Sequence, residues 1–134
     1  MKRAAGLIAA ALVAGCVVFE VFKEPSPTTY TAGSRELKIG EAVSTVPAAA
    51  VTLDFFREAN AQPFIGRVFV EADRAASAPR VVVLSHDLWT RHFGAQPDVI
   101  GRAIDIDGRP AIVVGVAPRG FSVPNGAQLW TVRR

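Results

Sequence analysis

The stretch Arg80–Gly94, RVVVLSHDLWTRHFG, decides the fold class of this 134-residue chain. Three valines and a leucine run without polar alternation, which predicts a strand buried on both faces. Ser85 follows at once and is suited to accept a hydrogen bond from the first turn of a helix. We therefore expect a helix over residues 86–93, ended by Gly94 in a left-handed conformation. A strand that leads directly into a capped helix is a compact α/β unit.

The predicted helix carries large apolar side chains on one side. Trp89 and Phe93 are four residues apart, so they lie one above the other and are predicted to pack into the core. Further along the chain, Gly101 is expected to end a turn before a β-hairpin. The hairpin is predicted because residues 103–106 alternate in polarity and Asp107-Gly108 is a favoured pair for a type I′ turn.

The segments around this unit contribute shorter elements. Residues 48–51 are small and apolar, which indicates a buried strand, and Thr52 is a plausible N-cap for a helix over residues 53–60. Short strands are also expected at 35–40, 68–70, 110–116 and 129–132. Together these patterns predict an α+β fold: a small mixed sheet with two short helices and a C-terminal β-hairpin, preceded by an N-terminal apolar membrane or signal helix.

Residues 1–22 are predicted to be a signal peptide or a membrane anchor. Lys2 and Arg3 precede an uncharged apolar stretch, as in secretory signals. The sequence Val13-Ala14-Gly15-Cys16 resembles a bacterial lipoprotein processing site, which makes Cys16 a lipidation candidate. Alternatively, residues 4–22 form one helix of ~28 Å, close to the thickness of the bilayer hydrocarbon. Both interpretations export the following residues and tether them to a membrane.

The rest of the chain is expected to comprise a linker and one domain. Residues 23–40 include Pro25 and Pro27 and are predicted to be an extended linker that lifts the domain from the membrane. The domain is predicted over residues 41–134. Cys16 is the only cysteine, so no intramolecular disulfide is expected.

No pattern in the chain indicates catalysis or a cofactor. Ser85, His86 and Asp87 are consecutive, so on a helix their side chains point about 100° apart and cannot relay a proton. The sequence has no glycine-rich nucleotide-binding loop and no zinc-protease motif. The net charge of +3 falls to +1 without Lys2 and Arg3, and no basic patch with interleaved aromatic residues occurs. We therefore expect no enzyme activity, no cofactor or metal, and no bound nucleotide or nucleic acid.

Several short strings, in order, resemble one family. They are VTLDFF (51–56), QPFIGRVF (62–69), VVLSHDLW (82–89) with Arg91, Phe93 and Gly94, VIGR (99–102), IDG (106–108) and VVGV (113–116), followed by Pro118, Gly120, Phe121 and Leu129-Trp130. From about Ala48 to Val132 the chain is similar to the extracytoplasmic, or periplasmic core, domain of MacB-type ABC transporter permeases. Within that family, the sequence most resembles the group of large permeases typical of acidobacteria.

The resemblance implies a non-catalytic domain that receives a substrate or contacts a partner protein. It implies a location in the cell envelope, with the chain anchored to the inner membrane and the domain in the periplasm. Other ABC transporter subunits are the partners that it suggests. The residues within the shared strings are then structural: Ser85 as a cap, Gly94, Gly101 and Gly108 in turns with Asp107, and Trp89 and Phe93 in the core.

Departures from the family leave three hypotheses. In the family a long segment separates the first membrane helix from this strand, whereas here only about 30 residues separate the predicted N-terminal helix from Val51, and neither a second membrane helix nor an ATPase domain follows. The first hypothesis is an accessory module that binds or scaffolds a transporter partner. The second is an anchored lipoprotein with an unrelated binding role. The third is a non-functional fragment of a truncated permease, in which apolar strand faces are expected to lie uncovered.

Overall fold

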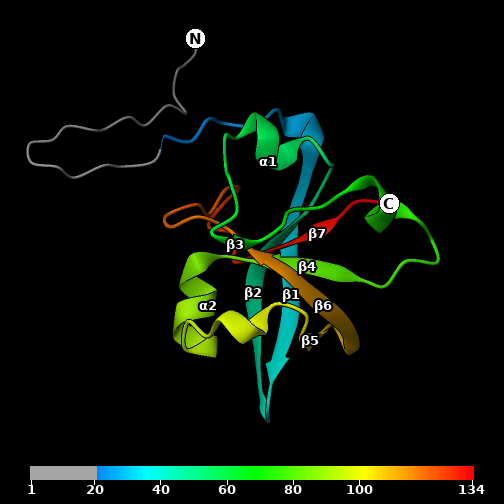
Figure 1. Ribbon diagram of the computed structural model, residues 1–134, viewed down its shortest axis with the longest axis vertical. Coiled ribbons are helices and arrows are strands. Elements are labelled where there is room, and N and C mark those ends of the chain that lie inside the picture. The colour runs from blue at the N-terminus through cyan, green and yellow to red at the C-terminus, as the bar shows by residue number, and fades with distance from the viewer. Residues whose placement is uncertain (1–20) are drawn as a thin grey trace, which may run out of the picture.

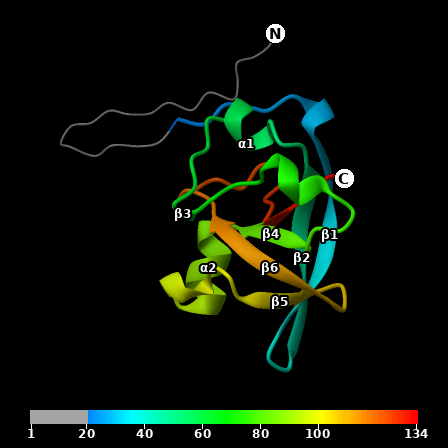
Figure 2. The same ribbon diagram turned by 45° about the vertical axis from the view of Figure 1, so that its right-hand side comes forward.

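The computed structural model describes residues 21–134 (Figures 1 and 2). Cys16 and the predicted apolar helix up to residue 20 lie outside the described residues. Val21 and Phe22, the predicted end of that helix, are not helical, and the Phe22 ring packs against Phe121 with the centroids 5.1 Å apart. No helix between residues 21 and 134 is long and apolar enough to cross a membrane.

Seven strands and two short helices make up the described part of the chain. The strands are β1 (Tyr30–Ile39), β2 (Ala42–Val51), β3 (Ile65–Gly66), β4 (Val81–Leu84), β5 (Ala103–Ile106), β6 (Arg109–Val116) and β7 (Leu129–Val132). The helices are α1 (Phe55–Glu58) and α2 (His86–Phe93). Single 3-10 turns lie at Pro27–Thr29, Glu71–Arg74 and Pro97–Val99.

The strands form one mixed sheet in the order β3-β6-β4-β7-β2-β1-β5. β4 is parallel to β6 and β2 is parallel to β7, whereas the other pairs are antiparallel. β5 pairs with β6 as well as with β1, so the six strands other than β3 close into a ring of pairings. The mixed sheet and the two helices were predicted from the sequence, but closure was not.

The β4–α2 unit is built as its sequence predicts. All four residues of β4 are buried. The Leu88 backbone N–H donates to the Ser85 side-chain oxygen over 2.9 Å at the start of α2. Gly94 follows the helix with φ of 63°, a conformation that glycine adopts without a Cβ penalty. At the β5–β6 hairpin, both Asp107 (φ 55°) and Gly108 (φ 80°) have the positive φ that a type I′ turn requires.

Two hydrophobic clusters cover opposite faces of the sheet, which explains why β4 shows no alternation. Val82 and Leu84 belong to a cluster with α2, whereas Val81 and Val83 belong to a second one beneath α1. The second cluster is aromatic: Phe55, Phe56, Phe121 and Trp130 make ring contacts with centroids 5.1–6.1 Å apart. Among the large apolar side chains of the strands within residues 21–134, Val43 on β2 is exposed, at 57%.

β1 is longer than the sequence predicts. A short strand was expected at residues 35–40 inside an extended linker, but β1 begins at Tyr30 and pairs with β2 over ten residues, from Tyr30↔Val51 to Ile39↔Ala42. Much of the segment assigned to the linker therefore belongs to the sheet. Most β1 side chains are exposed, and residues 31–36 include no large apolar side chain. Only the end of the strand, with Leu37 and Ile39, shows the apolar alternation by which strands are recognised.

Two local expectations were wrong. The first helix begins at Phe55 rather than Leu53, no side chain caps it, and the Thr52 hydroxyl is buried without a partner within the described residues. Residues 68–70 form no strand. Instead, the two-residue strand β3 precedes them and pairs with the end of β6.

Candidate partner-binding surface

An aromatic cluster lies at the N-terminal end of α2. The Phe64 ring meets the His86 imidazole edge to face at 4.7 Å between centroids, and lies 5.6 Å from the Trp89 ring. His86 and Trp89 are themselves 5.3 Å apart. A backbone hydrogen bond from the Phe64 N–H to the Val116 carbonyl, 2.7 Å long, fixes the segment that carries Phe64.

Arg119 completes the cluster from the loop after β6. Its guanidinium carbon lies 5.5 Å from the centre of the Phe64 ring, within the range of a cation–π contact. Its Nε donates to His86 Nε2 over 3.4 Å. Burial, and then the nearby Arg119 charge, lower the pKa of His86, so the neutral imidazole that accepts this bond is favoured. We call Phe64, His86, Trp89 and Arg119 the Phe64 platform.

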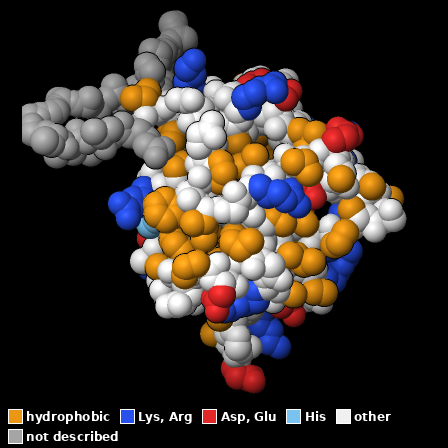
Figure 3. Space-filling model, viewed as in Figure 1, with side chains coloured by type: hydrophobic (Ala, Val, Ile, Leu, Met, Phe, Trp, Pro, Cys, Tyr) orange, Lys and Arg blue, Asp and Glu red, His pale blue; other side chains and the backbone are white. Residues whose placement is uncertain are grey.

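The Phe64 ring of the platform is exposed to solvent, whereas contacts with the fold fix the side chains around it. The Phe64 side chain is 45% exposed, which is high for a large apolar residue, and Ile100 beside Gly66 is 36% exposed. Trp89 is buried, and its indole N–H donates to the Gln96 carbonyl over 3.0 Å. Apolar side chains gather over α2 and β3 on the face seen in Figure 3. Such a rigid, exposed aromatic surface is typical of binding sites.

The consecutive Ser85, His86 and Asp87 do not form a catalytic group. Ser85 is buried, and its hydroxyl accepts from Leu88 and donates to the Gln128 side chain over 3.2 Å. Asp87 pairs with Arg91 over 2.9 Å, one turn further along the helix. His86 contacts Arg119 instead. The three side chains therefore serve three different partners, as expected from their helical spacing.

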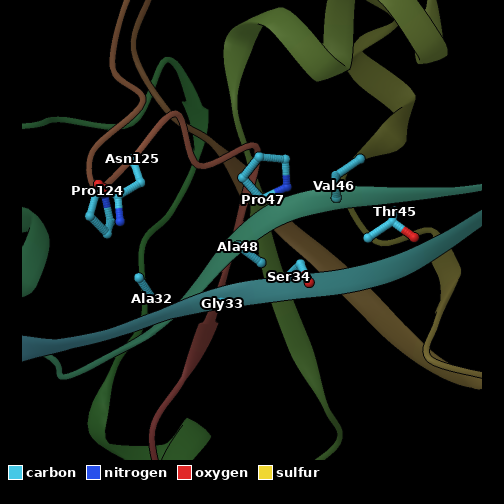
Figure 4. Close-up of a pocket in the computed structure, with 9 residues that line it drawn as sticks. All are labelled: Ala32, Gly33, Ser34, Thr45, Val46, Pro47, Ala48, Pro124 and Asn125. Atoms are coloured by element: carbon cyan, nitrogen blue, oxygen red, sulfur yellow. The ribbon is translucent and has the colours of Figure 1, made fainter.

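A shallow pocket of about 480 Å³ lies between the β1–β2 hairpin and the loop that holds Pro124 and Asn125 (Figure 4). Its lining is small and uncharged: Ala32, Gly33, Ser34, Thr45, Val46, Pro47, Ala48, Pro124 and Asn125. It contains no group that could act as an acid, a base or a metal ligand other than hydroxyl and amide oxygens. The pocket therefore offers apolar contact rather than chemistry.

The other residues singled out from the sequence are dispersed. Phe93 is 9% exposed, at the edge of the core below Arg102, whose guanidinium lies 5.9 Å from its ring centre. Gly101 has φ of 92° and its N–H donates to the Val113 carbonyl over 2.8 Å. Asp107 lies in the turn between β5 and β6. Between residues 21 and 134, no three His, Cys, Asp or Glu side chains gather in a way that could hold a metal ion.

Comparison with known proteins assigns the family. The model of the MacB-like periplasmic core domain matches residues 6–131, which is most of the chain. The chain belongs to this family. The match begins far before Ala48, so β1 and β2 are part of the MacB-like domain and not an addition to it. The narrower placement in an acidobacterial-type permease group stays a prediction.

Two solved structures share the fold of this MacB-like domain. One is the extracellular domain of the noncanonical ABC-type transporter YknZ from Gram-positive bacteria, with a TM-score of 0.63 at 17% identity, over 78% of this chain and 52% of that one. The other is the periplasmic region of MacB from Actinobacillus actinomycetemcomitans, with a TM-score of 0.64 at 23% identity, over 78% of this chain and 46% of that one. The chain thus spans about half of each. No curated protein matches it significantly.

The sequence did not indicate the Phe64 platform. Phe64, His86 and Arg119 come from three separate segments, and no periodicity marks them as neighbours. Phe64 lies in one of the strings that carry the family resemblance, but nothing local shows that its ring is exposed. The proline before it, Pro63, was the available signal that the chain leaves regular structure there.

Proposed function

We propose that the chain is a non-catalytic envelope module that binds an ABC transporter subunit through the Phe64 platform. The family is described as periplasmic, and the two structural neighbours are extracytoplasmic parts of proteins named as an ABC-type transporter and as MacB. The absence of an acid–base or metal constellation among the described residues is consistent with a binding role.

The exposure of Phe64 is the observation that carries this proposal. A partner that covers this phenylalanine ring, which is 45% exposed, would remove apolar surface from water, and that removal favours binding. The ring is already ordered by His86, Trp89 and Arg119, so binding would immobilise few rotatable bonds. Aromatic and arginine side chains that are ordered in this way are the commonest residues at the energetic centre of protein interfaces.

The proposal includes a tether. Residues 1–22 would anchor the chain to the inner membrane and leave the domain in the periplasm, either as a helix or through a lipid on Cys16. Labelling with radioactive palmitate distinguishes the two. A lipoprotein incorporates label that Cys16→Ala abolishes, and this form would also suit an anchored lipoprotein with an unrelated binding role. A helix leaves the N-terminus uncleaved and unlabelled.

Co-purification tests the binding role. The full chain, tagged at its C-terminus, is purified from host membranes in a maltoside detergent and its companions are identified by mass spectrometry. We expect a permease or ATPase subunit of an ABC transporter, and we expect Phe64→Ala to reduce its yield at least about tenfold, as for a residue at an interface centre. Val43→Ala is the matched control, because Val43 is 57% exposed on the distant β1–β2 hairpin. Equal losses for both variants would contradict the assignment of the platform.

A further inference from the structure

Four arginines from distant parts of the sequence line one small pocket. Arg35 lies on β1, Arg80 precedes β4, Arg109 begins β6 and Arg134 follows β7. The pocket has a volume of about 210 Å³, and the rest of its lining is Val81, Thr131 and Val132. It lies where β4 and β6 begin and β7 ends, whereas the Phe64 platform lies where β4 and β6 end.

Arg80 occupies the centre of this cluster. Its Nη1 donates to the carbonyl oxygens of Arg109, at 3.2 Å, and Ile106, at 3.4 Å, so the guanidinium lies beneath the β5–β6 hairpin. Burial lowers the pKa of Arg80, and the charge of Arg109 lowers it further; the Asp107 carboxylate raises it, and the charges of Arg35 and Arg134 lower it again. A guanidinium held among three others of like charge is stabilised by any anion that enters.

The carboxylates around the pocket do not neutralise it. Asp107 pairs with Arg35 over 3.4 Å, and its other oxygen accepts the Glu36 backbone N–H over 2.9 Å. Asp73 lies near Arg134 but accepts two bonds from Arg67, at 2.9 and 3.2 Å. The four guanidiniums of the pocket therefore keep a clear excess of positive charge.

The arginines differ in how many of their donors are engaged. Arg134 donates to the carbonyls of Asp73, Ala78 and Pro79 over 3.0–3.2 Å and is largely committed to the fold. Arg80 donates hydrogen bonds to the described residues through Nη1 alone. Within residues 21–134, the Arg109 guanidinium makes no hydrogen bond or ion pair. Arg80, Arg109 and Arg35 thus retain N–H groups that can reach a ligand in the pocket.

We infer that this arginine pocket binds a phosphate group that can carry two negative charges, supplied either by inorganic phosphate or by a phosphomonoester lipid headgroup at the membrane surface. Guanidiniums present paired N–H donors that match the oxygens of phosphate and carboxylate. Two features favour phosphate. The donors come from four strands or strand ends and so converge from several directions, which suits a tetrahedral group better than a planar carboxylate. The excess of positive charge also matches a dianion better than a monoanion. The inference does not depend on the proposed transporter partner.

An NMR titration of the full chain in a neutral maltoside detergent tests the pocket. Sodium phosphate is added to the ¹⁵N-labelled protein, and the arginine Nε–Hε resonances are followed, with sodium acetate and sodium chloride at equal ionic strength as controls. We expect saturable shifts of Arg80 and Arg109 with phosphate alone. Arg80→Gln should weaken the apparent Kd at least about tenfold, as expected for one charge-assisted hydrogen bond. Arg91→Gln, which removes the same charge from α2, should leave it unchanged.

A second variant guards against misfolding. Arg109 is exposed and its guanidinium makes no hydrogen bond or ion pair within the described part of the chain, so Arg109→Gln should fold normally and still weaken phosphate binding. Equal shifts with acetate or chloride, or equal weakening by Arg91→Gln, would overturn the inference. Co-flotation then identifies the source of the phosphate. The proposed tether itself gives a baseline of flotation with phosphatidylcholine alone. Greater flotation with vesicles that also contain phosphatidic acid, lost in Arg109→Gln, assigns the lipid headgroup, whereas equal flotation with both vesicles leaves free phosphate.

Discussion

Replacing Ser85 by alanine is the sharpest test of how the β4–α2 unit is held. The serine is 1% exposed, and its side-chain oxygen accepts the Leu88 N–H over 2.9 Å. Alanine leaves that N–H in a buried helix end without a partner, and water has little access to it because Leu88 is fully buried. The variant therefore loses the N-cap and also carries the cost of an unsatisfied buried donor.

The size of this effect follows from the geometry. Loss of a serine N-cap costs about 1 kcal/mol on average, and burial of the freed N–H moves the value toward the upper end of the range, about 2 kcal/mol. The lost bond to Gln128 adds little, because that side chain is only partly buried and keeps a contact with Arg91 at 3.4 Å. For a folded unit of this size, about 2 kcal/mol corresponds to a fall in Tm of roughly 8 °C.

Urea unfolding followed by tryptophan fluorescence measures it, because Trp89 and Trp130 are both buried. Ser44→Ala is the control: Ser44 is exposed on β2, and its removal should change the free energy of unfolding by less than about 0.5 kcal/mol. Ser85→Thr, which keeps the hydroxyl, should recover most of the loss. A Ser85→Ala value indistinguishable from that of Ser44→Ala would refute the reasoning.

Two further predictions concern the fold. Gly115→Ala should cost more than about 3 kcal/mol, since a Cβ there overlaps the Arg67 carbonyl oxygen, whereas Gly33→Ala, which meets nothing within 4 Å, should cost less than about 1 kcal/mol in the same urea assay. The hydrogen bond from Arg67 lowers the pKa of Asp73 below its ordinary value of 3.8, so its stabilising effect is complete above that value and is lost as the pH falls through the lower folded pKa. Thermal unfolding from about pH 5 to about pH 2.5 should therefore show a shallower loss of stability for Asp73→Asn than for the unchanged chain, and equal slopes would contradict the assignment.

Local signals explain the parts of the fold that were predictable. The β4–α2 unit follows from 15 consecutive residues, because an apolar run, a capping serine and a terminal glycine each act on their immediate neighbours. The β5–β6 hairpin follows from Asp107-Gly108 for the same reason. Thr52 shows the limit of such signals. Threonine is a residue type that often caps helices, but the N-cap position of α1 is occupied by Asp54, two residues later.

Pairings between distant segments explain what was missed. β1 is a strand because Tyr30–Ile39 pairs with β2 along its whole length, and because Leu37 and Lys38 also pair with Ile106 and Asp105 of β5. Its own sequence is too polar to show this. The parallel pairing of β2 with β7 joins segments about 80 residues apart and has no local signature.

The two surfaces were hidden for the same reason. The sequence shows no basic patch, because the four arginines of the pocket are spread from Arg35 to Arg134 and only the closed sheet brings them together. The Phe64 platform likewise depends on the Phe64 segment, α2 and the loop with Arg119 meeting at one point. The composition therefore gives the net charge of the chain, but it does not show which arginines lie together in the folded structure.

Site-specific photocrosslinking tests the proposed function most directly. A benzophenone amino acid is placed at position 64 of the full chain in the living host, where its ring takes the place of Phe64, and at position 57 as the control, because Arg57 is 77% exposed on α1. The account predicts a light-dependent adduct at position 64 with a permease or ATPase subunit of an ABC transporter, and none at position 57. No adduct at position 64, or the same adducts at both positions, would contradict it.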